Sequence, residues 1–191
     1  MMRWIAYALA MTCCAVMPLR ADEMRPPDHV ALDGGRTVPL AAHARRTHLL
    51  GAQETYTLAV YVEGSIDGAR LAAADAAKAL RIDVTYVDDL RRPEPFDWRR
   101  ELVPPLEPPA VAHLRGAFAA LRHGDVVLIA YVPGRGTVIR VNSVVVVSAA
   151  HHDLMLAFLD HWLGQRPVSE EMKRTLLAPS YPAAHAARTE R

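Results

Sequence analysis

The chain has 191 residues, of which 51% are hydrophobic and 23% are charged. This is the composition of a globular domain with a sizeable core, and it excludes a chain that is disordered throughout. Its 22 Lys and Arg oppose 21 Asp and Glu, so the charge balance lacks the strong positive field that attracts nucleic acids, and we expect no nucleic-acid partner.

The first 21 residues have the pattern of a secretory signal peptide. A basic start, Met1–Arg3, precedes the apolar run Trp4–Met17, and the small residue Ala21 stands at the expected cleavage position. The run is too short to span a ~30 Å hydrocarbon core as a helix, and no later stretch is long and apolar enough, so we expect no membrane span. The sequence therefore predicts cleavage after Ala21 and a periplasmic or secreted protein. Both cysteines lie in the run, which leaves the mature chain without thiols or disulfides.

The N-terminal half of the mature chain predicts strands before any helix. Val30–Leu40 reads as a hairpin that turns at Asp33-Gly34-Gly35. Ala41–Gly51 has no clean periodicity, and Tyr56–Val62 then has the β-branched and aromatic character of a buried strand. Arg46 is therefore expected shortly before a core strand.

An Ala-rich segment follows, and it predicts a helix. Asp67 is suited to cap a helix that runs to about Leu80, with Lys78 near its favourable C-terminal end. A strand follows at Ile82–Tyr86, where apolar and polar residues alternate. Residues 93–109 contain six prolines and are expected to form an irregular loop inside the domain.

The C-terminal half has the clearest pattern. Asp125–Ser148 predicts a three-stranded antiparallel meander, because three β-branched runs are separated by short turns. Helices are expected on both sides of this meander. One starts at Pro109 and ends near Gly124, the next covers His152–Leu163, and a short one, Glu170–Leu177, is capped by Ser169. The elements together predict one α+β domain over residues 22–178, with helices on one face of an antiparallel sheet, and a flexible tail over residues 179–191.

The nine histidines are candidate metal ligands. The densest group is His151-His152-Asp153 with Asp160-His161, but no histidine pair has the i, i+4 spacing that places two ligands on one helix face. Gly134-Arg135-Gly136 joins two strands and lacks the helix N-terminus of a phosphate site. We therefore expect no metal ion or other cofactor, and we assign no catalytic residue.

The last third of the chain combines several short motifs in a fixed order. They are Gly124-Asp125, Tyr131–Thr137, Asn142, and above all Trp162-Leu163-Gly164 with Pro167-Val168-Ser169 and Leu176-Leu177. With this order and spacing, the segment resembles the chalcone isomerase-like family of exported bacterial proteins. A weaker match covers Leu40–Val62. The resemblance implies an open-faced β-sandwich, in which helices cover a large antiparallel sheet and an apolar ligand cleft lies between them.

The resemblance also implies roles for three residues. Arg46 falls on the arginine that holds an oxyanion or carboxylate in this superfamily, a task suited to the planar guanidinium. Tyr56 and His161 fall on two further polar positions of the family. The threonine, tyrosine and asparagine network of the flavanone-forming enzymes has no match here, whereas non-catalytic members bind fatty acids through arginine and tyrosine. The expected ligand-binding residues are thus Arg46, Tyr56 and His161, although Tyr56 and Tyr61 must point to opposite faces of their strand.

Three hypotheses about function remain open at this stage. The first is an exported, non-catalytic binding protein for a small amphiphile or carboxylate such as a fatty acid. The alternatives are an isomerase or intramolecular lyase that uses Arg46 to stabilise an oxyanion, and an interaction module of the cell envelope without a small ligand. The sequence predicts no oligomeric state.

Overall fold

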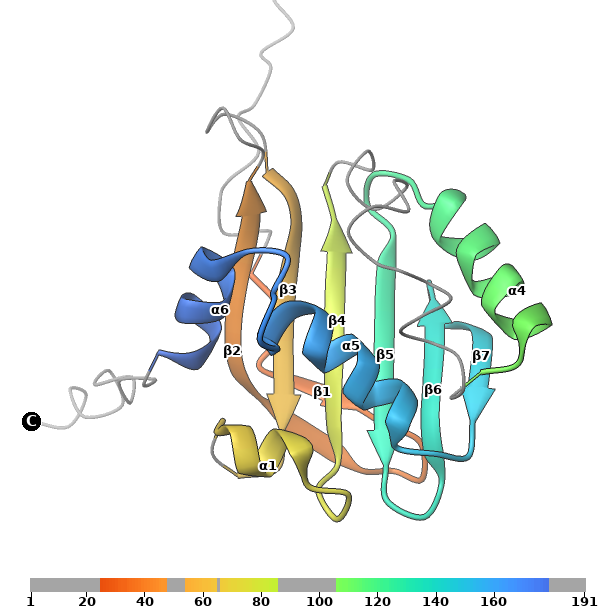
Figure 1. Ribbon diagram of the computed structural model, residues 1–191, viewed down its shortest axis with the longest axis horizontal. Helices are drawn as coiled ribbons and strands as arrows, with labels where there is room; N and C mark the ends of the chain where they lie inside the picture. The colour runs from red at the N-terminus through yellow and green to blue at the C-terminus, as the bar shows by residue number, and fades with distance from the viewer. Residues whose placement is uncertain (1–24, 48–53, 65, 86–105, 179–191) are drawn as a thin grey trace, which may run out of the picture.

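The computed structural model describes residues 25–47, 54–64, 66–85 and 106–178. These residues form a seven-stranded antiparallel sheet in which the strands lie side by side in chain order (Figure 1). The strands are β1 (His29–Ala31), β2 (Thr37–Thr47), β3 (Glu54–Val62), β4 (Lys78–Val84), β5 (Val126–Val132), β6 (Gly136–Val141) and β7 (Val144–Ala149).

The helices gather on one face of the sheet. In Figure 1, α5 crosses the middle strands, while α6 lies along β2 and α4 lies beside β7. A short helix, α1, joins β3 to β4 at one end of the sheet. The helices are α1 (Gly68–Ala72), α4 (Pro108–Ala119), α5 (Asp153–Leu163) and α6 (Glu170–Leu177).

Two apolar cores lie on opposite faces of the sheet, as the period-2 alternation of strand side chains requires. The helix-side core joins alternate residues of the strands, such as Leu58, Leu80 and Ile129, to the buried faces of the helices. The smaller core on the other face, here called the back core, contains Tyr61 and Ala79.

A hairpin covers part of the back core. β1 and the start of β2 pass behind the sheet in Figure 1, and they bring Leu32 and Val38 onto the back core. The turn of this hairpin is anchored to β6, because Arg140 Nη2 donates to both carboxylate oxygens of Asp33 at 2.8 Å. This sheet with a helical layer is the expected α+β architecture, and it confirms that prediction.

Most of the predicted elements are present. The first hairpin, the three-stranded meander and the last two helices are confirmed. Ser169 caps α6 as expected, since its hydroxyl accepts a hydrogen bond from the Met172 amide. The helix predicted from Pro109 begins one residue earlier, at Pro108, and ends at Ala119.

Two predictions about local structure are wrong. Asp67 does cap a helix, but α1 ends at Ala72, and Lys78 belongs to strand β4 instead of a helix that reaches Leu80. The second strand of the predicted hairpin also extends beyond Leu40, because β2 continues to Thr47. A register shift between Leu40 and Ala42 interrupts its alternation, which hides the strand from a period-2 pattern.

The predicted signal peptide, the predicted C-terminal tail and most of the proline-rich segment lie outside the described residues. Within the described part, none of the helices is both long enough and apolar enough to span a bilayer.

Candidate functional site

Strand pairing places Arg46 and Tyr56 next to each other. Arg46 near the end of β2 is directly opposite Tyr56 on β3, and residues opposite each other in an antiparallel pair share one face of the sheet. Tyr56 belongs to the helix-side core, so Arg46 is on the helix-covered face as well. The Arg46 carbonyl accepts a hydrogen bond from Thr55 Oγ1 at 3.0 Å, which fixes the backbone at this point.

The Tyr56 hydroxyl connects the sheet to α5. Trp162 Nε1 donates a hydrogen bond to Tyr56 Oη at 3.0 Å, and both side chains are only 3% exposed. A buried indole N–H and a buried phenol oxygen each need a polar partner. This bond therefore positions the C-terminal end of α5 over the β2–β3 edge of the sheet, where Arg46 lies.

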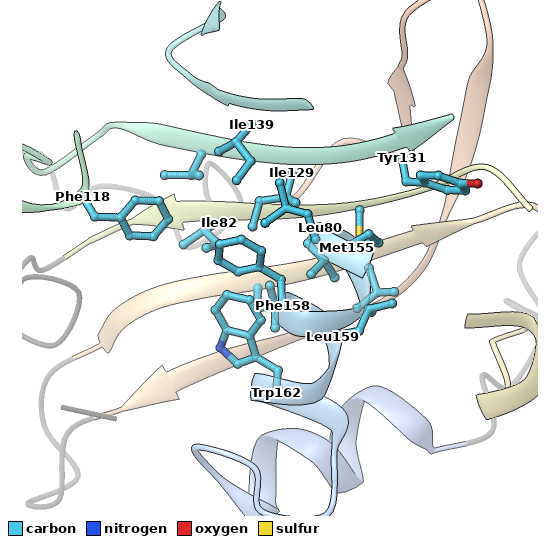
Figure 2. Packing of buried hydrophobic residues seen from close by; sticks show 14 of the residues in the cluster. Leu80, Ile82, Phe118, Ile129, Tyr131, Ile139, Met155, Phe158, Leu159 and Trp162 are labelled. Atoms are coloured by element: carbon cyan, nitrogen blue, oxygen red, sulfur yellow. The ribbon is translucent and has the colours of Figure 1, made fainter. Parts of the chain in front are cut away.

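An aromatic row extends from this bond across the helix-side core (Figure 2). Trp162 stacks near Phe158, with ring centroids 6.2 Å apart and an angle of 19° between the planes. Phe158 in turn lies 6.5 Å from Phe118 of α4. These buried rings pack on Leu80, Ile82 and Ile129 of the sheet. The described side chains under α5 thus contact one another, and the polar groups of the candidate site lie at the margin of this packed layer.

His161 joins this margin through its neighbour on α5. Its ring meets the edge of Trp162 with centroids 4.8 Å apart and an interplanar angle of 78°. Burial lowers the pKa of His161 to about 4, so the imidazole is uncharged at neutral pH. Its carbonyl accepts a hydrogen bond from the Val168 amide, which ties the segment after α5 to the same place.

Arg46 is the cation of this site. Its side chain is half-buried, and within the described part of the chain its guanidinium has no hydrogen bond or ion pair. Arg45 differs, because it pairs with Thr57 on the opposite face of the sheet and is exposed. A half-buried guanidinium with vacant donors is suited to bind a carboxylate or another oxyanion.

The structure thus brings two of the three predicted residues together, Arg46 and Tyr56, and links His161 to them through Trp162. The sequence did not indicate the polar role of Trp162, which depends on a partner 106 residues away. Tyr61 lies in the back core, on the other face from Tyr56, as the odd spacing predicted.

A second polar cluster was also missed. Lys78 is buried among α1, β4 and α5, where it contacts His152. The only sequence signal was the rarity of lysine, which occurs at positions 78 and 173 alone. Among the described residues, no three His, Cys, Asp or Glu side chains gather in a way that could hold a metal ion.

Comparisons with known proteins found a match to a protein family and a match to a solved structure. A family model described as chalcone isomerase-like matches residues 22–178. A solved structure of a fatty-acid binding protein from Arabidopsis thaliana is 14% identical to this chain, with a TM-score of 0.47, and the alignment covers 78% of this chain and 95% of that one. No curated protein matches the sequence.

Proposed function

Because this chain belongs to the chalcone isomerase-like family, whose pattern matches residues 22–178, we propose that it is a non-catalytic binding protein for a small amphiphile with an anionic head, such as a fatty acid. The observation that carries the proposal is the half-buried guanidinium of Arg46, placed opposite Tyr56 at the margin of an aromatic core. The same proposal includes export, since the matched region begins directly after the predicted signal peptide.

Arg46 would bind the head group. The guanidinium presents parallel N–H donors that match the two oxygens of a carboxylate. Partial burial reduces the screening of its charge by water, which strengthens the attraction. Tyr56 and Trp162, already bonded to each other, hold the neighbouring surface rigid, so little side-chain order would be lost on binding.

The tail of the ligand would contact apolar side chains that the core leaves partly uncovered at this margin. Ala42 lies on β2 on the same face as Arg46, and Leu163 and Val168 lie at and after the end of α5. Each square ångström of apolar surface removed from water contributes on the order of 25 cal/mol. A modest alkyl chain therefore adds usefully to a single charged contact.

A titration of a fluorescent fatty acid tests this proposal. Arg46→Ala is expected to weaken binding by at least about tenfold, because a charge-assisted hydrogen bond to a carboxylate contributes about 1.5–3 kcal/mol. The matched control is Arg45→Ala, which removes the adjacent arginine from the opposite face of the sheet and is expected to leave the affinity unchanged.

A second arm tests the head group itself. The corresponding fatty alcohol has the same tail and no charge, so Arg46→Ala is expected to leave its affinity nearly unchanged. Equal binding of the acid by the wild type and Arg46→Ala would remove Arg46 as the anchor. No binding of either compound by the wild type would reject the proposed ligand class.

A further inference from the structure

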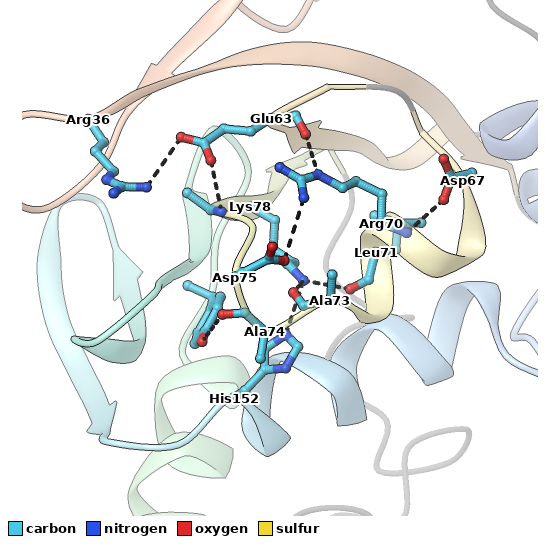
Figure 3. Close-up of polar contacts among 12 residues, drawn as sticks. Arg36, Glu63, Asp67, Arg70, Leu71, Ala73, Ala74, Asp75, Lys78 and His152 are labelled. Carbon is cyan, nitrogen blue, oxygen red and sulfur yellow. Dashed lines mark hydrogen bonds and ion pairs between the residues drawn. The ribbon is translucent and has the colours of Figure 1, made fainter.

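Lys78 is a buried lysine whose ammonium group has three polar partners at the ends of two helices. It is the first residue of β4, and it is 1% exposed. Its Nζ donates to the carbonyl oxygens of Leu71 at 2.7 Å and Ala73 at 2.5 Å, which are at the C-terminal end of α1 (Figure 3). The third partner is Nε2 of His152, 3.1 Å away, at the start of α5.

The three N–H hydrogens of Lys78 Nζ determine the protonation state of His152. An ammonium group has three N–H donors and no acceptor. Two of the donors point to carbonyls, so the third meets Nε2, which must carry a lone pair. His152 is consequently neutral in this arrangement, with its proton on Nδ1.

Ring contacts extend this connection to β5. The imidazole of His152 lies on the ring of Tyr131, with centroids 4.2 Å apart, and Lys78 Nζ lies 5.5 Å from the same ring. The Tyr131 hydroxyl donates to the Ala74 carbonyl at 2.7 Å. One histidine thus joins the start of α5 to the turn between α1 and β4, a pairing of segments more than 70 residues apart.

The surrounding charges favour this protonation state at neutral pH. Burial lowers the pKa of Lys78 to about 8, with a smaller lowering by Arg70 and an opposing effect of Asp75, so the lysine is charged at pH 7. Burial also lowers the pKa of His152 below 6.5, the nearby Lys78 lowers it further, and Asp153 opposes them. Four titratable or charged groups surround the Lys78–His152 pair. They are Arg70 on α1, Asp75 on the α1–β4 turn, Tyr131 on β5, and Asp153 on α5.

We propose that Lys78 and His152 form a pH-sensitive latch, closed at neutral pH and opened in mild acid, that fastens the start of α5 to the α1–β4 turn. When Nε2 takes up a proton, it loses the lone pair that accepts from Lys78. The Lys78 ammonium and the His152 imidazolium are then two cations whose N–H donors face each other, so repulsion replaces the hydrogen bond. The imidazolium leaves the lysine for water, and the first turn of α5 loses its attachment to the turn. This latch is independent of the proposed ligand.

The direction of the pH dependence follows from linkage. The pKa of His152 is lower in the closed state than in the open or unfolded state, where it is near 6.5. The open state therefore takes up a proton first as the pH falls below 6.5. The latch contributes fully above that pH, and its contribution is lost as the pH falls through the pKa of the closed state. Lys78 stays charged over this whole interval.

Amide hydrogen exchange of the full chain between pH 7.5 and 5.0 tests the latch, with rates corrected for the intrinsic pH dependence of exchange. The protection of the Leu156 amide, which donates to the His152 carbonyl, and of the Leu71 and Ala73 amides is expected to fall together, severalfold, below pH 6.5. The range stops at pH 5 because His161 takes up its proton near pH 4. His152→Gln keeps a neutral acceptor that does not titrate, and it is expected to retain its protection across the range.

The neighbouring histidine supplies a matched control. His151 has an exposed side chain, and His151→Gln is expected to show the same loss of protection as the wild type. An NMR titration of the wild type adds a second readout, in which the amides of residues 71–74 shift with the apparent pKa of the His152 ring. The latch would be overturned if His152→Gln kept the full pH dependence, or if His152 titrated without any change at residues 71–74.

Discussion

The bond between Trp162 and Tyr56 is a buried side-chain hydrogen bond that links α5 to the sheet. It is surrounded by the aromatic row and the strands of the helix-side core, where water does not compete. None of the buried side-chain nitrogen and oxygen atoms in the described part of the chain lacks a hydrogen-bond partner. Removing one partner of this pair therefore leaves a buried polar group unsatisfied, which costs more than the net gain of the bond.

A double-mutant cycle measures this coupling. Tyr56→Phe is expected to lower the free energy of unfolding by about 1–3 kcal/mol, since Trp162 Nε1 loses its acceptor. Trp162→Phe is expected to cost more, because it also leaves a cavity. The double variant should lose less than the two single losses together, by about 0.5 kcal/mol or more. Urea unfolding checks this, and strictly additive losses would show that the bond contributes no coupling.

At the residue scale, the sequence identified candidate site residues but not the residues that they contact. Arg46 and Tyr56 were chosen through a family resemblance, and their adjacency became visible only with the register of β2 against β3. The contact of Lys78 with His152 was out of reach, because no local pattern reports a pairing between residues 74 positions apart. Hydrogen-bond partners of buried polar groups are set by the tertiary fold.

Two glycines at the turn between β5 and β6 are constrained in different ways. Gly134 and Gly136 both have positive φ, 75° and 88°, a conformation that costs other residues about 1–2 kcal/mol. The surroundings of the two differ. A Cβ at Gly136 would collide with the backbone of Ala149, the last residue of β7, and of Ala150, whereas a Cβ at Gly134 would meet nothing within 4 Å.

Alanine substitution at each glycine separates the energetic cost of the positive φ angle from the cost of a steric clash with β7. Gly134→Ala is expected to lower the free energy of unfolding by about 1 kcal/mol, the cost of the left-handed backbone alone. Gly136→Ala is expected to cost several times more, because β6 and β7 must move apart to admit the methyl group. Thermal unfolding of both variants measures the two losses of stability. Equal losses would mean that β6 and β7 can move apart here at little energetic cost.

At the element scale, the predictions that held rest on signals that fix where an element starts and stops. The meander combined β-branched runs with short turns, and α6 combined the Ser169 cap with two acidic residues in its first turn. For the helix from Asp67, the cap is confirmed, but the predicted extension to Leu80 relied on alanine propensity, which is weak compared with tertiary context. Lys78 gains three polar partners and strand pairing by entering β4, so the strand replaces the last turns of that helix.

At the scale of the whole molecule, the proposal of export predicts where the chain is cleaved. The family match starts at residue 22, directly after the predicted cleavage position at Ala21. Expression of the full-length chain in a bacterial host with a periplasm is expected to yield a protein that begins at Asp22. Ala21→Trp is expected to retain residues 1–21, because signal cleavage requires a small residue at that position.

Intact mass measurement reads the outcome of this experiment directly. Ala31→Trp, a change of the same size on β1, serves as the control and is expected to leave the processing site intact. A wild-type protein that keeps residues 1–21 would contradict the proposal of export.

The order of the strands has a consequence for biosynthesis. Each strand before β7 pairs with the next one in the chain, so hairpins are able to close one after another as the polypeptide emerges with its N-terminus first. The helix that seals the aromatic core, α5, comes only after the last strand. A nascent chain interrupted before Asp153 would therefore contain the complete sheet with part of its apolar helix-side face exposed to water. Such an exposed face is a binding site for chaperones and makes the chain prone to aggregation and proteolysis.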